Sequence, residues 1–191
     1  AGARARFVEP ELQAFGRYLD RGGRMLVLVD PELAPAGGLV ETGLEGWLDA
    51  YGVKVGANIV VDPGATVPFT SADTLSAGAT GAHPIVRSLE QAKVGVIVAL
   101  ARSVAAGRAP EGTAAQVLLE TTAEGWGETD LANLKAVAKD ARDLSGPVPL
   151  AVAVGAQAKD AAPAELEDEE PTPPAPKPAA DAKAPEWRLV V

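Results

Sequence analysis

The chain has 191 residues, of which 47% are hydrophobic, and a formal net charge of −9. This length predicts one domain, residues 1–191, with a single core. The negative charge argues against nucleic acid as a partner, because phosphate contacts need clustered Lys and Arg, and an anionic membrane surface would also repel the chain. The absence of cysteine excludes disulfides, thiolate catalysis and zinc-thiolate sites.

The N-terminal third predicts a helix followed by a buried strand. Pro10 suits a first helical turn, and apolar residues recur near helical spacing over residues 12–19. The apolar run at residues 25–29 then ends in Asp30 and Pro31. Fully apolar runs of this length, bounded by turn residues, are typical of strands buried on both faces of a parallel sheet.

The same pattern occurs a second time. Residues 40–51 carry one apolar helical face, residues 53–55 are extended, and the apolar run at residues 59–61 ends in a further Asp-Pro pair at Asp62. Proline cannot donate a ladder hydrogen bond, so each strand should end there. We therefore expect Asp30 and Asp62 at the carboxyl edge of one sheet, where open α/β proteins place their sites.

The rest of the chain predicts further alternation. Residues 64–82 are small and polar without a period, which favours a long loop. The later predicted elements are a helix over 84–91, strands over 94–100 and 116–121, a weakly periodic helix over 130–141 and a strand over 148–154. Alternating strands and helices predict a three-layer α/β fold with a mostly parallel sheet. Where less helix lies between the later strands, we expect an antiparallel part.

The segment over residues 159–184 differs in composition from the rest. It combines an acidic block at 165–170 with a proline-rich run at 171–178. Such a segment cannot bury enough surface to offset its ordering entropy, so we predict a flexible acidic insertion; a proline-rich recognition ligand is the alternative. Residues 187–191 again look like a strand, and the chain stops inside it. We expect a C-terminally truncated piece whose membrane anchors lie outside it.

Candidate chemistry is sparse. Asp30 and Asp62 could hold Mg²⁺ as in receiver domains, but such a site needs more oxygen ligands, and Asp before Pro commonly caps a turn. His83, the only histidine, is a candidate general base or a cap for a helix or loop. Trp126 is a candidate recognition aromatic or a side chain that seals the edge of the core.

Motifs for known catalytic loops are missing. Neither a Gly-x-Ser-x-Gly nucleophile elbow nor a phosphate-binding glycine loop occurs in the sequence. We therefore assign no catalytic, cofactor-binding or metal-binding residue. The hypothesis is a candidate interaction edge formed by Asp30, Pro31, Asp62, His83 and Trp126.

Several segments occur in a familiar order. They are residues 19–31, 44–53 and 60–62, then His83-Pro84-Ile85, residues 118–128 and 146–153, and the strand-like end at 187–191. In order and spacing, this series resembles the GldG-type auxiliary components of ABC transporters. The resemblance covers most of residues 7–154. The acidic insertion at 159–184 departs from the family pattern.

The resemblance implies a fold and a role. The fold would be flavodoxin-like or glutamine-amidotransferase-like without a catalytic triad, with related domains in intraflagellar transport proteins. The role would be that of a non-enzymatic periplasmic domain of an inner-membrane protein, associated in some bacteria with gliding motility. Its partners would be the membrane and ATP-binding subunits of an ABC transporter and another envelope protein or glycan, without a cofactor. The alternative is a degenerate Mg-dependent phosphoacceptor or amidotransferase-like enzyme that uses Asp30, Asp62 and His83.

Overall fold

A computed structural model describes residues 3, 5–35, 37–71, 73–81, 83–132, 137–156 and 188–191. The helices described are α1 (Glu9–Asp20), α2 (Leu44–Asp49) and α3 (Arg87–Ala92). The strands described are β1 (Arg24–Leu26), β2 (Val53–Val55), β3 (Ile59–Val61), β4 (Thr74–Ala79), β5 (Val96–Ala99), β6 (Val104–Ala106), β7 (Thr113–Glu120), β8 (Trp126–Glu128), β9 (Leu144–Ser145), β10 (Pro149–Ala156) and β11 (Arg188–Val190). The predicted insertion at 159–184 lies outside the described residues.

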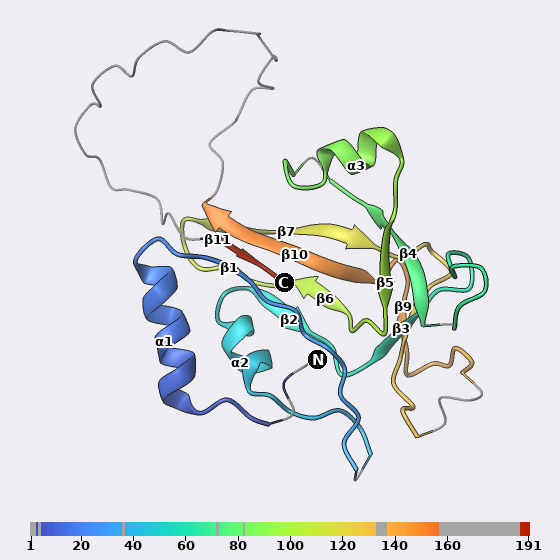
Figure 1. Ribbon diagram of the computed structural model, residues 1–191, viewed down its shortest axis with the longest axis horizontal. Coiled ribbons are helices and arrows are strands. Elements are labelled where there is room, and N and C mark those ends of the chain that lie inside the picture. Colours follow the sequence, from blue (N-terminus) through green and yellow to red (C-terminus); the bar gives the residue numbers. More distant parts are fainter. Residues whose placement is uncertain are drawn as a thin grey trace, which may run out of the picture.

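The largest sheet has six strands in the order β1-β11-β10-β7-β4-β5 (Figure 1). Only the β1–β11 pair is parallel, and every other pair in this sheet is antiparallel. The prediction of a three-layer, mostly parallel, flavodoxin-like or amidotransferase-like sheet is therefore wrong.

Two smaller antiparallel sheets complete the strand layout, with orders β2-β6 and β3-β8-β9. The strands β6, β8 and β9 were not predicted from the sequence. Residues 64–82 were predicted to form a loop, although β4 lies within that range. The helix predicted over residues 130–141 is absent from its described parts, 130–132 and 137–141.

The physical reason for the wrong sheet type lies in β10, which is buried on both faces. Val152 and Val154 belong to the cluster that contains residues of α1 and α2, whereas Ala153 belongs to a different cluster with Val86 and Leu118. A strand covered on both faces has a fully apolar sequence whichever way its neighbours run. The apolar runs thus indicated burial correctly, and the inference from burial to parallel pairing failed.

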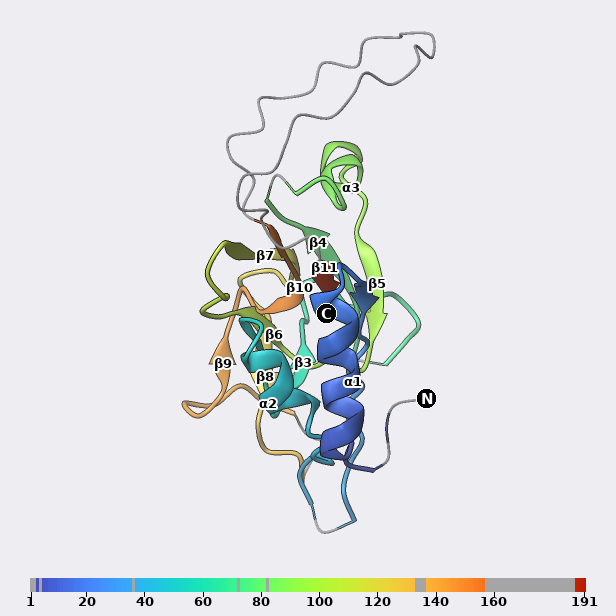
Figure 2. The same ribbon diagram turned by 90° about the vertical axis from the view of Figure 1, so that its left-hand side faces the viewer.

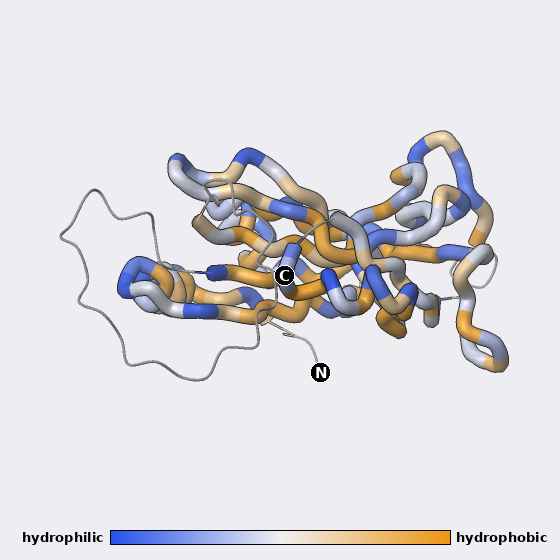
Figure 3. The backbone as a smooth tube through the Cα atoms, turned by 90° about the horizontal axis from the view of Figure 1, so that it is seen from above, coloured by the Kyte–Doolittle hydropathy of each residue, from blue (hydrophilic) through white to orange (hydrophobic). Residues whose placement is uncertain are grey.

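Helices α1 and α2 lie next to one another at one face of the strands (Figure 2). Each contributes a fully buried leucine, Leu19 and Leu48, to the largest core cluster. The rings of Phe15 in α1 and Trp47 in α2 join the helices, with centroids 5.8 Å apart, and Trp47 also contacts Tyr51 just after α2 at 4.8 Å. Hydrophobic residues concentrate along the inner strands and hydrophilic residues along many outer turns (Figure 3). No helix in the described part of the chain has the length and apolarity needed to cross a bilayer.

Candidate functional site

Asp62 follows β3 and is completely buried. Its Oδ1 accepts hydrogen bonds from the Gly64 N–H at 3.0 Å and the Thr122 hydroxyl at 2.8 Å. Its Oδ2 accepts the Thr122 N–H at 2.7 Å. The carboxylate therefore closes its own turn and ties that turn to the segment between β7 and β8. This geometry fits the interpretation that the aspartate of the Asp-Pro pair caps a turn.

His83 lies between β4 and α3, half-buried, and acts locally as a cap. Its Nδ1 accepts a hydrogen bond from the Ile85 N–H at 3.2 Å, and its carbonyl accepts the N–H groups of Val86 and Arg87. Burial, aided by the positive charge of Arg188, lowers the pKa of His83 below its usual value. Both effects favour a neutral imidazole whose Nδ1 lone pair is occupied by the turn.

Trp126 begins β8 and is buried, and it pairs with Val61 of β3 on one side and Ser145 of β9 on the other. Its indole Nε1 donates to Glu128 Oε2 at 3.3 Å. The other oxygen of Glu128 accepts the Asp130 N–H at 2.8 Å, and Glu128 is itself only 3% exposed. The buried ring is therefore not presented to a partner as an exposed recognition aromatic would be.

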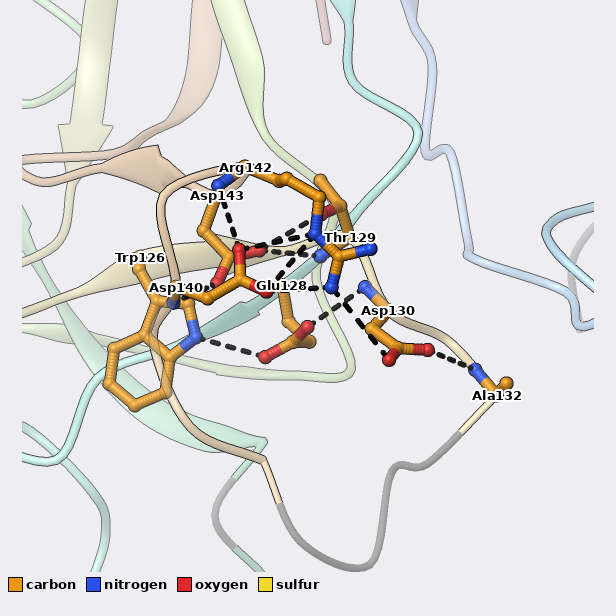
Figure 4. Close-up of polar contacts among 8 residues, drawn as sticks. All are labelled: Trp126, Glu128, Thr129, Asp130, Ala132, Asp140, Arg142 and Asp143. Carbon is orange, nitrogen blue, oxygen red and sulfur yellow. Dashed lines mark hydrogen bonds and ion pairs between the residues drawn. The ribbon is translucent and has the colours of Figure 1, made fainter.

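The described parts of the loop between β8 and β9, residues 129–132 and 137–143, are held by their own polar groups (Figure 4). Asp143 accepts the N–H and hydroxyl of Thr129, both at 2.9 Å, and the N–H of Asp140 at 2.8 Å. Burial alone would raise the pKa of Asp143, but these hydrogen bonds outweigh it and the pKa is lowered. The hydrogen bond from Arg142 lowers the pKa of Asp140, and the same contact raises the pKa of Arg142. The described residues contain no group of three or more His, Asp or Glu side chains arranged to hold a metal ion.

The residues of the predicted edge come from different sheets and connecting segments. Asp30 is exposed and Pro31 is buried, and both follow β1 of the six-stranded sheet. Asp62 directly follows β3 and Trp126 begins β8, which pair in the three-stranded sheet, while His83 precedes α3. β1 and β3 therefore do not share the carboxyl edge of one parallel sheet. The candidate interaction edge rested on parallel strands, and that basis is removed.

A different feature of the surface is the outer side of β5, the last strand of the six-stranded sheet. Ile97 is 66% exposed, and Val94 and Leu100 beside it are also exposed. No charged residue occurs between residues 94 and 101. We refer to the outer side of residues 94–100 as the β5 edge. The sequence reading recognised this run only as a buried strand; its lack of charge was the available signal.

A cavity of about 450 Å³ lies on another part of the molecule. It is lined by segments before and within α2, by Val55 and Ala57, and by the side chain of Arg102. Arg102 forms an ion pair with Glu45 at 3.0 Å, and Glu45 Oε2 accepts the Thr42 hydroxyl at 3.1 Å. Burial would raise the pKa of Glu45, but its hydrogen bonds, including the one from Arg102, lower it. Nothing in the sequence marked this pair, whose members are 57 residues apart.

The fold is that of a β-rich domain, with a mostly antiparallel six-stranded sheet and two smaller sheets. A solved structure entitled "mmIFT52 N-terminal domain" resembles it with a TM-score of 0.52 and 18% sequence identity, over 80% of this chain and 56% of that chain. The chain thus spans little more than half of that structure's length. A likeness at this identity shows the fold alone. No curated protein matches the chain.

The family is shown by the sequence itself. The chain belongs to the family described as "ABC-type uncharacterized transport system", which matches residues 1–190. The resemblance to GldG-type auxiliary components is confirmed, and the protein is an auxiliary component of an ABC-type transport system. This family is not a known enzyme family.

Proposed function

We propose that this domain is a non-enzymatic, extracytoplasmic interaction module of an ABC-type transport system. It would bind an extended segment of another protein of that system, which adds as a new strand along the β5 edge. Family membership supports the association with a transport system. The observation that carries the proposal is an edge strand that is apolar, uncharged and unpaired on its outer side among the described strands.

The pairing register shows which backbone groups β5 offers. The Leu100 N–H donates to the Asp73 carbonyl at 2.9 Å, so in the alternating antiparallel pattern Val98 and Val96 also bond toward β4. The N–H and C=O groups of Ile97 and Ala99 therefore point away from β4. An incoming extended segment can bond to these groups, which is the principle of strand addition.

The side chains around this edge also favour a partner. Exposed edge strands are normally protected by charged residues, proline or bulges, because they otherwise recruit other chains. The β5 edge has neither a charged residue nor a proline, and its exposed Ile97 adds apolar surface that a partner can cover. The chain has a net charge of −9, yet the edge strand of its main sheet is uncharged. Such a strand is a liability because it can pair with other chains unless a partner covers it.

The absence of an enzymatic role in this proposal follows from how the polar groups are used. The carboxylate of Asp62, the Nδ1 of His83 and the indole of Trp126 all engage in local hydrogen bonds that hold turns or strands. None of them is left to meet a substrate together with a second reactive group. We also propose a periplasmic position on a membrane-anchored protein, with a role in gliding motility where the host glides.

Binding is tested with the full-length protein co-expressed with the membrane and ATP-binding subunits of its own transport system. Ile97→Glu places a charge on the β5 edge, and Leu26→Glu is the matched control, because Leu26 is 67% exposed on β1 at the opposite end of the same sheet. We expect Ile97→Glu to abolish co-purification of the transport subunits and Leu26→Glu to preserve it. Equal recovery with both variants would refute binding at this edge.

A backbone test separates strand addition from simple apolar contact. Ala99→Pro removes an outward N–H but leaves the bonds of β5 to β4 in place, since proline is tolerated at edge positions that face solvent. We expect it to weaken binding of the subunits without unfolding the domain. Localisation is tested separately by placing one cysteine at Leu28, which is 76% exposed in a chain without cysteines. A membrane-impermeant maleimide should label it in cells with a permeable outer layer and an intact inner membrane; labelling only after lysis would refute the periplasmic position.

A further inference from the structure

The cavity beside α2 contains a buried charge with an unused donor. The Arg102 side chain is only 3% exposed. Its Nε donates to the Gly56 carbonyl at 2.7 Å, and its Nη1 donates to Glu45 Oε1 at 3.0 Å. No partner for Nη2 is found among the described residues. Every fully buried side-chain nitrogen or oxygen in that part of the chain has a partner, so Nη2 lies where it retains access to open space.

Arg102 is among the residues that line the cavity, and the cavity is therefore the open space that we assign to Nη2. A guanidinium held by two other contacts is fixed in position before any ligand arrives, which reduces the ordering cost of binding. The cavity volume of about 450 Å³ lies within the ordinary range of small-molecule sites. Its wall includes the apolar side chains of Val55 and Ala57. The site therefore combines one fixed cationic donor with an apolar wall.

We propose that this cavity binds a small organic carboxylate, with one carboxylate oxygen on Arg102 Nη2 and its apolar part against Val55 and Ala57. This inference does not rest on strand addition at β5. A singly charged carboxylate fits better than phosphate, because two glutamates, Glu41 and Glu45, line the same cavity. The second arginine of the lining, Arg6, is already 3.8 Å from Glu41. These two carboxylates would repel a dianion more strongly than a monoanion.

The purely structural alternative is that Arg102 only fastens Gly56 to α2. A variant is therefore needed that alters the cavity and leaves the Arg102 contacts intact. Gly46 meets this need because it lines the cavity, and a Cβ built on it finds nothing within 4 Å. Gly46→Leu puts a bulky side chain at the wall, and Gly46→Ala is the matched control. Both replace a glycine inside α2 with a better helix former, so the fold is retained.

The experiment is a titration of the isotopically labelled protein with hexanoate, followed by NMR at the Arg102 side chain and the Gly46 amide. Neutral hexanamide and inorganic phosphate are titrated in parallel. We expect hexanoate to bind saturably. Hexanamide should bind at least roughly tenfold more weakly than hexanoate, because it lacks the charge-assisted hydrogen bond. Gly46→Ala should retain hexanoate affinity within about twofold, whereas Gly46→Leu should weaken it by roughly tenfold or more.

Three results would overturn the proposal. The first is no saturable hexanoate shift up to about 50 mM, which leaves Arg102 a structural residue only. The second is phosphate binding as tight as hexanoate binding, which contradicts the assignment to carboxylates. The third is unchanged affinity in Gly46→Leu, which places hexanoate somewhere other than this cavity. Retention of the transport subunits is unaffected by any of these results, so the two proposals fail independently.

Discussion

Replacement of Asp62 by alanine should destabilise the domain strongly. The substitution leaves the N–H groups of Gly64 and Thr122 and the Thr122 hydroxyl without their acceptor, at a position where Asp62 is completely buried. Each unsatisfied buried group costs about 1–3 kcal/mol. Because the Thr122 hydroxyl can rotate toward another acceptor, we expect a total loss of about 3–5 kcal/mol, a large share of the roughly 5–15 kcal/mol of a whole domain.

Asparagine at the same position gives a graded comparison. One oxygen of Asp62→Asn can still accept the Thr122 N–H, and the new amide nitrogen then lies where Oδ1 had met Gly64 and the Thr122 hydroxyl. The hydroxyl can turn to accept from this amide, so only the Gly64 N–H loses its partner. The expected loss is about 1–3 kcal/mol, smaller than for alanine.

Urea unfolding followed by tryptophan fluorescence measures both losses, with the midpoint shift read at constant slope. Asp49→Ala is the control, because Asp49 is exposed on α2 and such substitutions usually change the free energy of unfolding by less than about 0.5 kcal/mol. If Asp62→Ala changed the free energy of unfolding by under about 1 kcal/mol, the carboxylate would not be a structural tie. The case for a functional Asp62 would then be open again.

Three further predictions concern other sites. His83 should titrate below pH 6.5 by NMR. Because its pKa is lower in the folded than in the unfolded protein, its contribution to the free energy of unfolding is complete above the unfolded pKa and falls as the pH drops toward the folded pKa. His83→Asn should remove this part of the pH dependence of stability. Asp143 has a lowered pKa, so its contribution to the free energy of unfolding is present above the usual aspartate pKa and is lost on acidification through the folded pKa. Asp143→Asn should therefore make acid unfolding less steep. Gly52→Ala should lower the melting temperature by several degrees, a loss of about 2 kcal/mol or more, because φ is +81° and the new Cβ would lie 2.5 Å from the Ala109 Cα; an unchanged melting temperature would refute this strain.

Local signals predicted individual elements well. The helix read from Pro10 and the spacing of residues 12–19 is α1, and Gly22 follows it with a positive φ, as a helix stop requires. The short runs at 53–55 and 59–61 coincide with β2 and β3. Such features depend on residues within one or two turns of each other, so a single sequence contains the needed information.

Elements that depend on distant pairing were missed. β8 has three residues, and its strand character comes from pairing with β3, more than sixty positions earlier in the chain. β4 contains a serine, two alanines and a glycine, so its composition resembles a loop; it is a strand because β5 and β7 flank it. Propensity within such short segments is weaker than the tertiary contacts that decide their state.

The same limit explains the candidate site. An acid after an apolar run shows that the chain leaves a sheet, and β3 does end directly before Asp62. It does not show what the carboxylate meets, because the principal partner of Asp62 is Thr122, 60 residues later. The partner of Arg102 is likewise a distant residue, Glu45. Both carboxylate oxygens of Asp62 accept hydrogen bonds, whereas Nη2 of Arg102 has no partner among the described residues. That difference makes Asp62 a structural tie and Arg102 a candidate ligand contact, and it depends entirely on which atoms the fold brings together.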